Sequence, residues 1–191
     1  MPIPSFDHRG LIPPVLNNPM SVDRSPYLAS MPEVVQRFGT TPRRRQLLRG
    51  LIAYRQLFAA DEYLTGVQLL DGSFVEDVEA NANREPGDID VFTLVAPPQK
   101  YVDDFSLWEN HGASYWETEL VNRGANKQRF SLDSYGTIID GATPIYDIMQ
   151  NVTYWYGLFS HQRDTFQWKG FIVVDVDTLN DVAALQMMGD E

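Results

Sequence analysis

The sequence predicts an α/β fold, a single domain in which helices flank a mixed β-sheet. Two observations carry this prediction. Helical and strand-like apolar patterns alternate along the chain, with no internal repeat or low-complexity tract between them. The chain is also long enough, at 191 residues with 43% hydrophobic residues, to bury one core.

The first 32 residues are rich in proline and cannot form a regular helix or a central strand. They hold seven of the chain's 12 prolines. The same stretch contains apolar side chains such as Phe6, Leu11 and Ile12, which favour packing over exposure to solvent. We therefore expect an extended arm over residues 1–32, packed on an α/β domain formed by residues 33–191, rather than a free tail.

The regular elements are expected in the order helix, strand, strand, helix, strand, helix, strand, helix. The first helix covers residues 42–60, with Thr41 as its N-cap, Pro42 as its first residue and leucines at helical spacing. Strands follow at residues 66–70 and 89–95, separated by a polar loop over residues 76–87. Later helices are expected within residues 101–124, 144–160 and 178–188, and later strands over residues 128–135 and 171–176.

Composition narrows the chemistry available to this chain. It has no cysteine and three widely spaced histidines, so a thiolate or histidine-rich zinc site is not expected. A bound metal would need carboxylate ligands, which suit Mg²⁺ or Mn²⁺. The net charge of −11 argues against a broad surface for nucleic acid or anionic lipid, but permits a nucleotide held through metal ions.

The N-terminus lacks the pattern of a signal peptide, and no apolar run reaches the roughly 20 residues of a membrane span. We expect a soluble, cytoplasmic protein that does not contact a membrane.

The residues best suited to chemistry begin where the first expected strand ends, at Gly72-Ser73. Gly72 lacks the Cβ atom that would keep a phosphate away, and the amide and hydroxyl of Ser73 can donate to phosphate oxygens. A helix beginning at Phe74 would add its N-terminal amides. The next strand opens with Asp88 and Asp90, which point to the same face because they are two residues apart.

Two carboxylates held side by side repel each other unless a cation lies between them, and hard divalent cations resolve that repulsion. An Asp-x-Asp pair alone, or a Gly-Ser turn alone, is common by chance. Their combination on consecutive strands is much more specific. It predicts a site that binds a metal–triphosphate complex.

Two-metal nucleotidyl transfer needs a further carboxylate, as a metal ligand or general base. Asp133 is the main candidate because it lies in an apolar strand pattern, where an unpaired aspartate is costly. The alternative for Asp133 is a hydrogen-bonded side chain at a strand end. Asp140 and Asp147 are weaker candidates. A second Asp-x-Asp pair, Asp175 with Asp177, follows no Gly-Ser turn and is expected to be mostly structural.

Two cations near the C-terminus, Arg163 and Lys169, are candidates for binding the triphosphate tail, with a surface loop as the alternative. His161, in the same segment, is expected to be structural. The only basic cluster lies at the start of the first helix. Its arginines are expected to form a solvated face, with a contact to phosphate or RNA as the alternative: Arg43, Arg44, Arg45 and Arg49.

Residues 70–75 (Leu-Asp-Gly-Ser-Phe-Val) and 87–91 (Gly-Asp-Ile-Asp-Val) resemble the minimal nucleotidyltransferases of the DNA polymerase β superfamily. The pattern of that superfamily is Gly-Ser, a loop, Asp-x-Asp and a later acidic residue on a strand. The resemblance implies a nucleotidyltransferase-like fold. It places Ser73 in a nucleotide-binding turn, makes Asp88 and Asp90 metal ligands, and makes Asp133 the third carboxylate.

Residues 3–14 (Ile-Pro-Ser-Phe-Asp-His-Arg-Gly-Leu-Ile-Pro-Pro) and the tripeptide Trp168-Lys169-Gly170 resemble a bacterial subgroup of this superfamily. One departure concerns the loop between Ser73 and Asp88. It is longer than in the most compact members and is acidic, which would disfavour a triphosphate.

The resemblance implies transfer of a nucleoside monophosphate from a nucleoside triphosphate such as ATP to a hydroxyl on a protein, an RNA end or a small molecule, with Mg²⁺ or Mn²⁺. The acidic composition favours a protein or small-molecule acceptor over long nucleic acid. Small relatives often act in bacterial toxin–antitoxin or defence systems. The alternative is a non-catalytic binding module of the same fold, which would act by binding a toxin or another partner protein.

Overall fold

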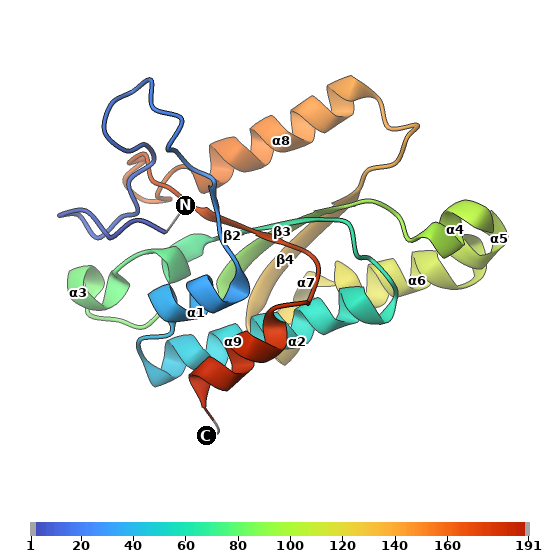
Figure 1. Ribbon diagram of the computed structural model, residues 1–191, viewed down its shortest axis with the longest axis horizontal. Helices are drawn as coiled ribbons and strands as arrows, with labels where there is room; N and C mark the ends of the chain where they lie inside the picture. The colour runs from blue at the N-terminus through green and yellow to red at the C-terminus, as the bar shows by residue number, and fades with distance from the viewer. Residues whose placement is uncertain (1–2, 190–191) are drawn as a thin grey trace.

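A mixed β-sheet forms the centre of the molecule in the computed structural model, which describes residues 3–189 (Figure 1). Within that range the sheet has five strands in the order β1-β5-β2-β3-β4. Strand β2 is antiparallel to β3 and β5, whereas β4 is parallel to β3 and β1 is parallel to β5. The strands are β1 (Tyr27–Leu28), β2 (Gly66–Asp71), β3 (Ile89–Val95), β4 (Leu132–Ile138) and β5 (Ile172–Asp175).

Helices cover both faces of the sheet, so the predicted single α/β domain with a flanked, mixed sheet is confirmed (Figure 1). One face carries α1 (Met31–Phe38), α2 (Pro42–Ala60), α7 (Arg123–Phe130) and α9 (Asp181–Met188), and the other carries α8 (Ile145–Phe159). The remaining helical segments are η1 (Gly72–Val75), α3 (Val78–Ala82), α4 (Gln99–Asp103), α5 (Phe105–Leu107), η2 (Trp108–Gly112), α6 (Ala113–Tyr115) and η3 (Trp116–Leu120).

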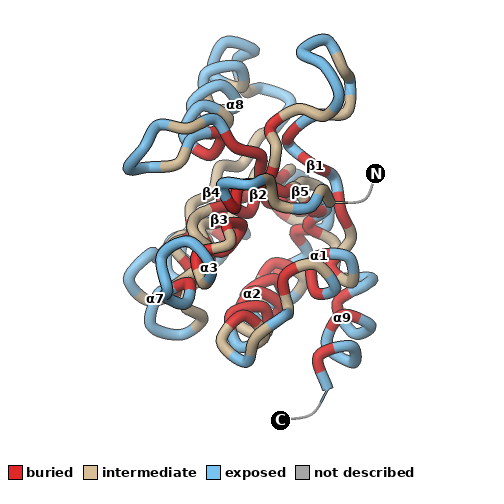
Figure 2. Tube along the Cα trace, turned by 90° about the vertical axis from the view of Figure 1, so that its left-hand side faces the viewer, coloured by how far each residue is buried: buried red, intermediate tan, exposed pale blue. Residues whose placement is uncertain are grey.

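The core is divided by the sheet into a large and a small part. Burial is concentrated in the strands and α2, while most of α8 is exposed (Figure 2). Ile89 and Val91 of β3 belong to the large cluster under α1, α2 and α9. Phe92 belongs to the small cluster, where its ring stacks on Trp155 of α8 at 4.3 Å. Because side chains alternate along a strand, Asp90 projects to the α8 side of the sheet.

Helix α2 forms as the sequence predicts. Thr41 is its N-cap and accepts a hydrogen bond from the Arg44 amide at 3.2 Å, and Pro42 is the first helical residue. Its leucines at positions 47, 48 and 51 and its Tyr54 are fully buried. No helix within residues 3–189 is long and apolar enough to cross a membrane.

Several predicted elements were wrong in extent. Residues 128–130 are not a strand, because α7 runs to Phe130 and Ser131 ends it in the left-handed conformation at φ 58°. Phe74 does not begin an α-helix, because residues 72–75 form a single 3-10 turn. The expected loop over residues 76–87 contains the short helix α3, and helix α1 and edge strand β1 were not predicted at all.

The proline-rich arm lies against the rest of the chain. Residues 3–24 contain no helix or named strand, yet Leu11 and Ile12 are buried. The Gly170 amide donates to the Ile12 carbonyl at 2.7 Å, and the Asp77 amide donates to the Gly10 carbonyl at 2.9 Å. These contacts tie the arm to both segments that border the site described next.

Candidate active site

Strand register brings three aspartates into one row across the sheet. Asp71 at the end of β2 pairs with Asp90 on β3, and Asp90 pairs with Asp133 on β4. Neighbouring strands lie about 4.8 Å apart, so adjacent carboxylates in such a row are close enough for their charges to act on one another. Asp88 lies two residues before Asp90, just ahead of β3. The pairing of Asp90 with Asp133 depends on the parallel alignment of β3 and β4, which the sequence does not reveal.

The turn at Gly72 is shaped by the carboxylate of Asp90. Gly72 has a φ of +80°, a conformation that suits glycine. A Cβ atom added at Gly72 would lie 2.6 Å from Asp90 Oδ2. The sequence pattern predicts that the missing Cβ atom of Gly72 makes room for a phosphate. In the structure, the Asp90 side chain occupies that room. Ser73 follows in the 3-10 turn, where Arg84 donates to its hydroxyl at 3.4 Å.

A cavity of about 820 Å³ opens beside this row, bordered by the C-terminal end of α8 and the segment that follows it. Seven residues predicted from the sequence as site residues line it: Gly72, Ser73, Asp88, Asp90, Asp133, Arg163 and Lys169. The weaker candidates Asp140 and Asp147 do not line it. The segment between Ser73 and Asp88 forms one wall, with α3 as its regular part.

Lys169 is not a solvent-exposed cation waiting for a ligand. It is 2% exposed, its Nζ lies 2.7 Å from Glu76 Oε1 and 3.0 Å from Asp71 Oδ1, and it donates to the Gly72 carbonyl at 3.3 Å. Burial lowers the pKa of Lys169, but the charges of Asp71 and Glu76 outweigh burial and the net pKa is raised. Lys169 therefore holds the Gly72 turn in place.

Asp71, which sequence reasoning did not select, is the most deeply buried carboxylate of the row. Burial raises the pKa of Asp71 to about 7, against the opposing charge of Lys169. Its position directly before Gly72 was the available signal, since an aspartate at the end of an apolar strand needs a buried partner.

Two cations from helix α7 contact the predicted metal ligands. Lys127 Nζ lies 2.7 Å from Asp88 Oδ2. Arg123 donates to both carboxylate oxygens of Asp133 at 2.8 and 3.0 Å, and its guanidinium lies 4.4 Å from the Tyr135 ring centre. Sequence reasoning missed both cations because it did not identify α7. Their spacing of four residues, typical of one helix face, was the signal that could have found them.

Asp90 is left as the uncompensated charge of the row. Among residues 3–189 it forms no ion pair, and Arg163, exposed at the cavity wall, has neither an ion pair nor a hydrogen bond. Burial raises the pKa of Asp90, Asp88 and Asp133 raise it further, and Arg163 and Lys169 oppose the shift. An array with this excess of negative charge favours a cation.

The carboxylates suit a hard divalent cation by their chemistry, since they offer only oxygen ligands. In the present side-chain arrangement, no cluster of three or more acidic or histidine side chains in the described part of the chain is placed to hold a metal. Asp88 and Asp133 are instead turned toward Lys127 and Arg123, whose side chains are 60% and 56% exposed. Such exposed ion pairs are weak, so these carboxylates can exchange partners at little cost.

The fold and this cavity together define an α/β protein with a charged cavity beside an acidic row of its central sheet. Residues 4–175 match the model of a family of unknown function, DUF6932, and the chain belongs to that family. The matched range contains all seven predicted site residues as well as the α7 cations. Searches of curated proteins and of solved structures give no significant match.

Proposed function

We propose that this protein is a metal-dependent nucleotidyltransferase with the fold and site of the DNA polymerase β superfamily. It would move a nucleoside monophosphate from a nucleoside triphosphate to a hydroxyl. The observation that carries the proposal is the register of β3 and β4, which places Asp90 beside Asp133, with Asp88 and the Gly72-Ser73 turn in the same cavity.

In this proposal Asp88, Asp90 and Asp133 would hold Mg²⁺ or Mn²⁺, and the Gly72-Ser73 turn would face the triphosphate. When bound, the metal would neutralise charge that develops on the phosphates during attack at the α-phosphorus. Asp133, at the outer end of the row, would accept the proton of the attacking hydroxyl once Arg123 has released its carboxylate. Pyrophosphate is the leaving group.

The volume of the site agrees with this substrate class, and the net charge of the chain bears on the acceptor. A volume of about 820 Å³ falls within the range of small-molecule sites, roughly 300–1,000 Å³, and it can hold a nucleoside triphosphate. The net charge of −11 favours a protein or a small molecule over long nucleic acid as the acceptor. A bacterial toxin–antitoxin or defence role is compatible with such an acceptor.

Metal-dependent binding of a labelled nucleoside triphosphate tests the proposal. We expect binding in Mg²⁺ or Mn²⁺ that is lost in EDTA and lost in the Asp88→Ala/Asp90→Ala variant. The matched control is Asp175→Ala/Asp177→Ala, which removes the same two charges from the same motif elsewhere in the molecule. If the wild type and the Asp88/Asp90 variant bind equally well, the proposal fails.

A non-catalytic binding module is the second candidate, and one observation favours it. Asp88 and Asp133 are already paired with Lys127 and Arg123, as they would be in a protein that never loads a metal. Mass spectrometry separates the two functions. Incubation of the purified protein and its co-purified partners with Mg²⁺ and the triphosphates adds a nucleotide mass only if the protein is an active transferase.

A further inference from the structure

Helix α7 presents two exchangeable cations to the acidic row. We propose that Arg123 and Lys127 bind the triphosphate, and that they move from carboxylates to phosphates when the metal enters. The inference rests on the proposed function and names residues of this chain that neither the sequence motif nor the family match assigns. It replaces Lys169, which is buried and fully engaged, as the main phosphate contact.

The backbone of α7 is held firmly beside β4, although its cations are exposed. Asn122 caps the helix by accepting from the Ala125 amide at 3.1 Å. Asn126 is buried and donates to the Leu120 carbonyl at 3.0 Å and to the Ser134 hydroxyl at 2.9 Å. Arg123 and Lys127 are four residues apart, so they share the face that borders the row. A fixed helix thus carries two flexible cations at the edge of the site.

Charge balance explains why these cations would change partners. Asp88, Asp90 and Asp133 would hold the divalent metal, whose two positive charges would compensate these carboxylates in place of Lys127 and Arg123. The released cations then lie next to whatever anion the metal carries. Arginine binds phosphate oxygens in a bidentate manner, and lysine binds them as a point charge.

Lys127 lines the cavity, and Arg123 reaches the row through Asp133 without lining the cavity. The other cations that line the cavity are less suited to this exchange. Releasing Lys169 would leave Asp71 and Glu76 buried without a partner, which is strongly unfavourable. Arg84 and Arg163 line the cavity, but neither forms an ion pair with Asp88 or Asp133, whose partners within residues 3–189 are Lys127 and Arg123. The exchange therefore concerns Arg123 and Lys127, the cations that now hold Asp133 and Asp88, whereas Arg163 can contact a phosphate without leaving a carboxylate.

The test uses two ligands whose affinities should change in opposite directions. The first is Mn²⁺ alone, measured from the electron paramagnetic resonance of free Mn²⁺. The second is a preformed Mn²⁺–tripolyphosphate complex, measured by calorimetry, which carries the phosphates without a base of unknown identity. The variants are Arg123→Ala and Lys127→Ala. Arg129→Ala is the matched control, because Arg129 lies on the same helix and forms an exposed ion pair with Glu119 at 2.6 Å.

We expect each variant to bind Mn²⁺ alone about two- to fivefold more tightly, because a competing ion pair of ordinary surface strength is removed. Each should bind Mn²⁺–tripolyphosphate about tenfold or more weakly, because a charge-assisted hydrogen bond to phosphate is lost. Lys127→Arg should restore most of the tripolyphosphate affinity. Arg129→Ala should leave both affinities within about twofold of the wild type.

Each other outcome has a definite meaning. Weaker binding of both ligands would show that α7 only positions the carboxylates, and it would overturn the exchange. Tighter Mn²⁺ binding with unchanged tripolyphosphate binding would make the cations simple competitors and would also overturn it. In both cases wild-type metal binding leaves the proposed function standing. A wild-type protein that binds neither ligand would refute the proposed function itself.

Discussion

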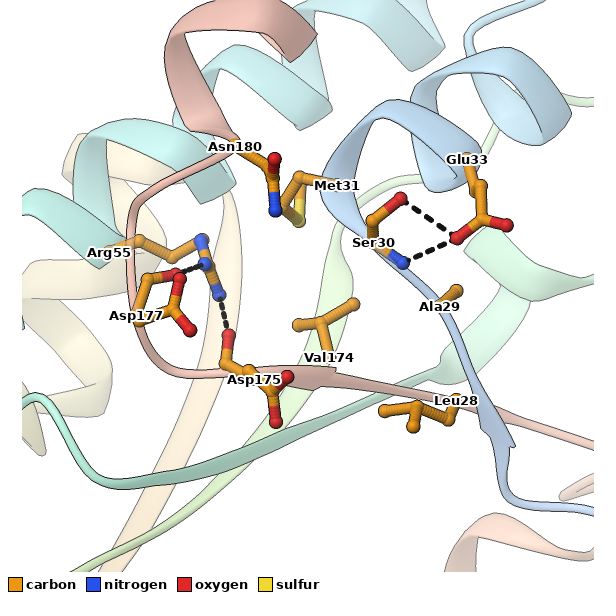
Figure 3. A pocket seen from close by; sticks show the side chains of 10 residues that line it. All are labelled: Leu28, Ala29, Ser30, Met31, Glu33, Arg55, Val174, Asp175, Asp177 and Asn180. Atoms are coloured by element: carbon orange, nitrogen blue, oxygen red, sulfur yellow. Dashed lines mark hydrogen bonds between the residues drawn. The ribbon is translucent and has the colours of Figure 1, made fainter. Parts of the chain in front are cut away.

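Two Asp-x-Asp pairs in this chain have the same sequence pattern but different surroundings. Asp90 lies on a central strand between Asp71 and Asp133, in a row of carboxylates beside a large cavity. Asp175 ends β5 opposite Val67, and the cavity it lines is only about 260 Å³ (Figure 3). The two pairs share one motif, so the motif does not decide which of them can take part in chemistry. That depends on the residues that strand pairing places beside each pair.

The cations near the two Asp-x-Asp pairs also differ, in their burial and in the groups that they contact. Arg55 is buried beside Asp175 and donates to the Asp175 carbonyl at 2.9 Å and to the Asp177 carbonyl (Figure 3). It also forms an ion pair with the buried Asp181, with Arg55 Nε 2.9 Å from Asp181 Oδ2, and donates a hydrogen bond to Gln68 Oε1 at 2.8 Å. Arg55 holds backbone and buried side chains together, whereas the α7 cations are exposed and form their ion pairs with Asp88 and Asp133. Arg123 also lies over the Tyr135 ring.

The largest expected difference between the regions is in stability. Arg55→Ala should lower the free energy of unfolding by about 3–5 kcal/mol, because it leaves Asp181 buried without a partner. Lys127→Ala should lower it by at most about 1 kcal/mol, because its ion pair is exposed. Urea unfolding of both variants measures the contrast. Equal losses would show that the two cations have the same structural role.

The next difference concerns catalysis. Asp133→Ala should slow single-turnover transfer of label from an α-labelled triphosphate by about 100-fold or more, the effect expected for loss of a general base. Asp175→Ala, which removes an exposed carboxylate from the other region, should leave the rate unchanged. The acceptor is the one identified by mass spectrometry. A loss of less than about threefold for Asp133→Ala would remove this residue from the catalytic set.

Local signals were sufficient for part of the fold. Thr41 and Pro42 specify the start of α2, and the β-branched run of residues 89–95 specifies β3. The strand expected over residues 128–135 failed in its first half because alternation there is only local. A local signal was overlooked there, because Asn122 caps α7 by accepting from the Ala125 amide. The packing of α7 against α2 and β4, which no local pattern reveals, completes the helix.

The candidate site also has a part that local sequence reveals and a part that it does not. Gly72 is adjacent to Ser73, and Asp88 lies two residues from Asp90, so a sequence pattern can find each pair. The pairing of Asp90 with Asp133 is set by strand register, which depends on how separate segments of the chain pack together. The ion pair of Lys127 with Asp88 and the clamp formed by Lys169 with Asp71 and Glu76 also join distant segments through packing. No local pattern encodes those contacts.

The smallest expected difference between the two regions concerns the free energy of unfolding of the metal-free protein, which the repulsion among the carboxylates of the acidic row lowers. Burial and the charges of Asp88 and Asp133 raise the pKa of Asp90 above its ordinary value of 3.8. The folded protein therefore retains a proton that the unfolded chain has lost, and stability falls as the pH rises through this window. Asp90→Asn removes this penalty and should stabilise the metal-free protein by about 1 kcal/mol at pH 8, but by less at pH 4.

Thermal or urea unfolding at the two pH values measures this gain, with the exposed Asp175→Asn as a control that should change little. Mg²⁺ should reverse the order, because it stabilises a wild-type protein that binds it and not a variant that has lost the ligand. A destabilised Asp90→Asn variant, or a gain that does not grow with pH, would mean that the row is as well satisfied as the network around Arg55. The distinction between an exchangeable and a structural acidic region would then not hold.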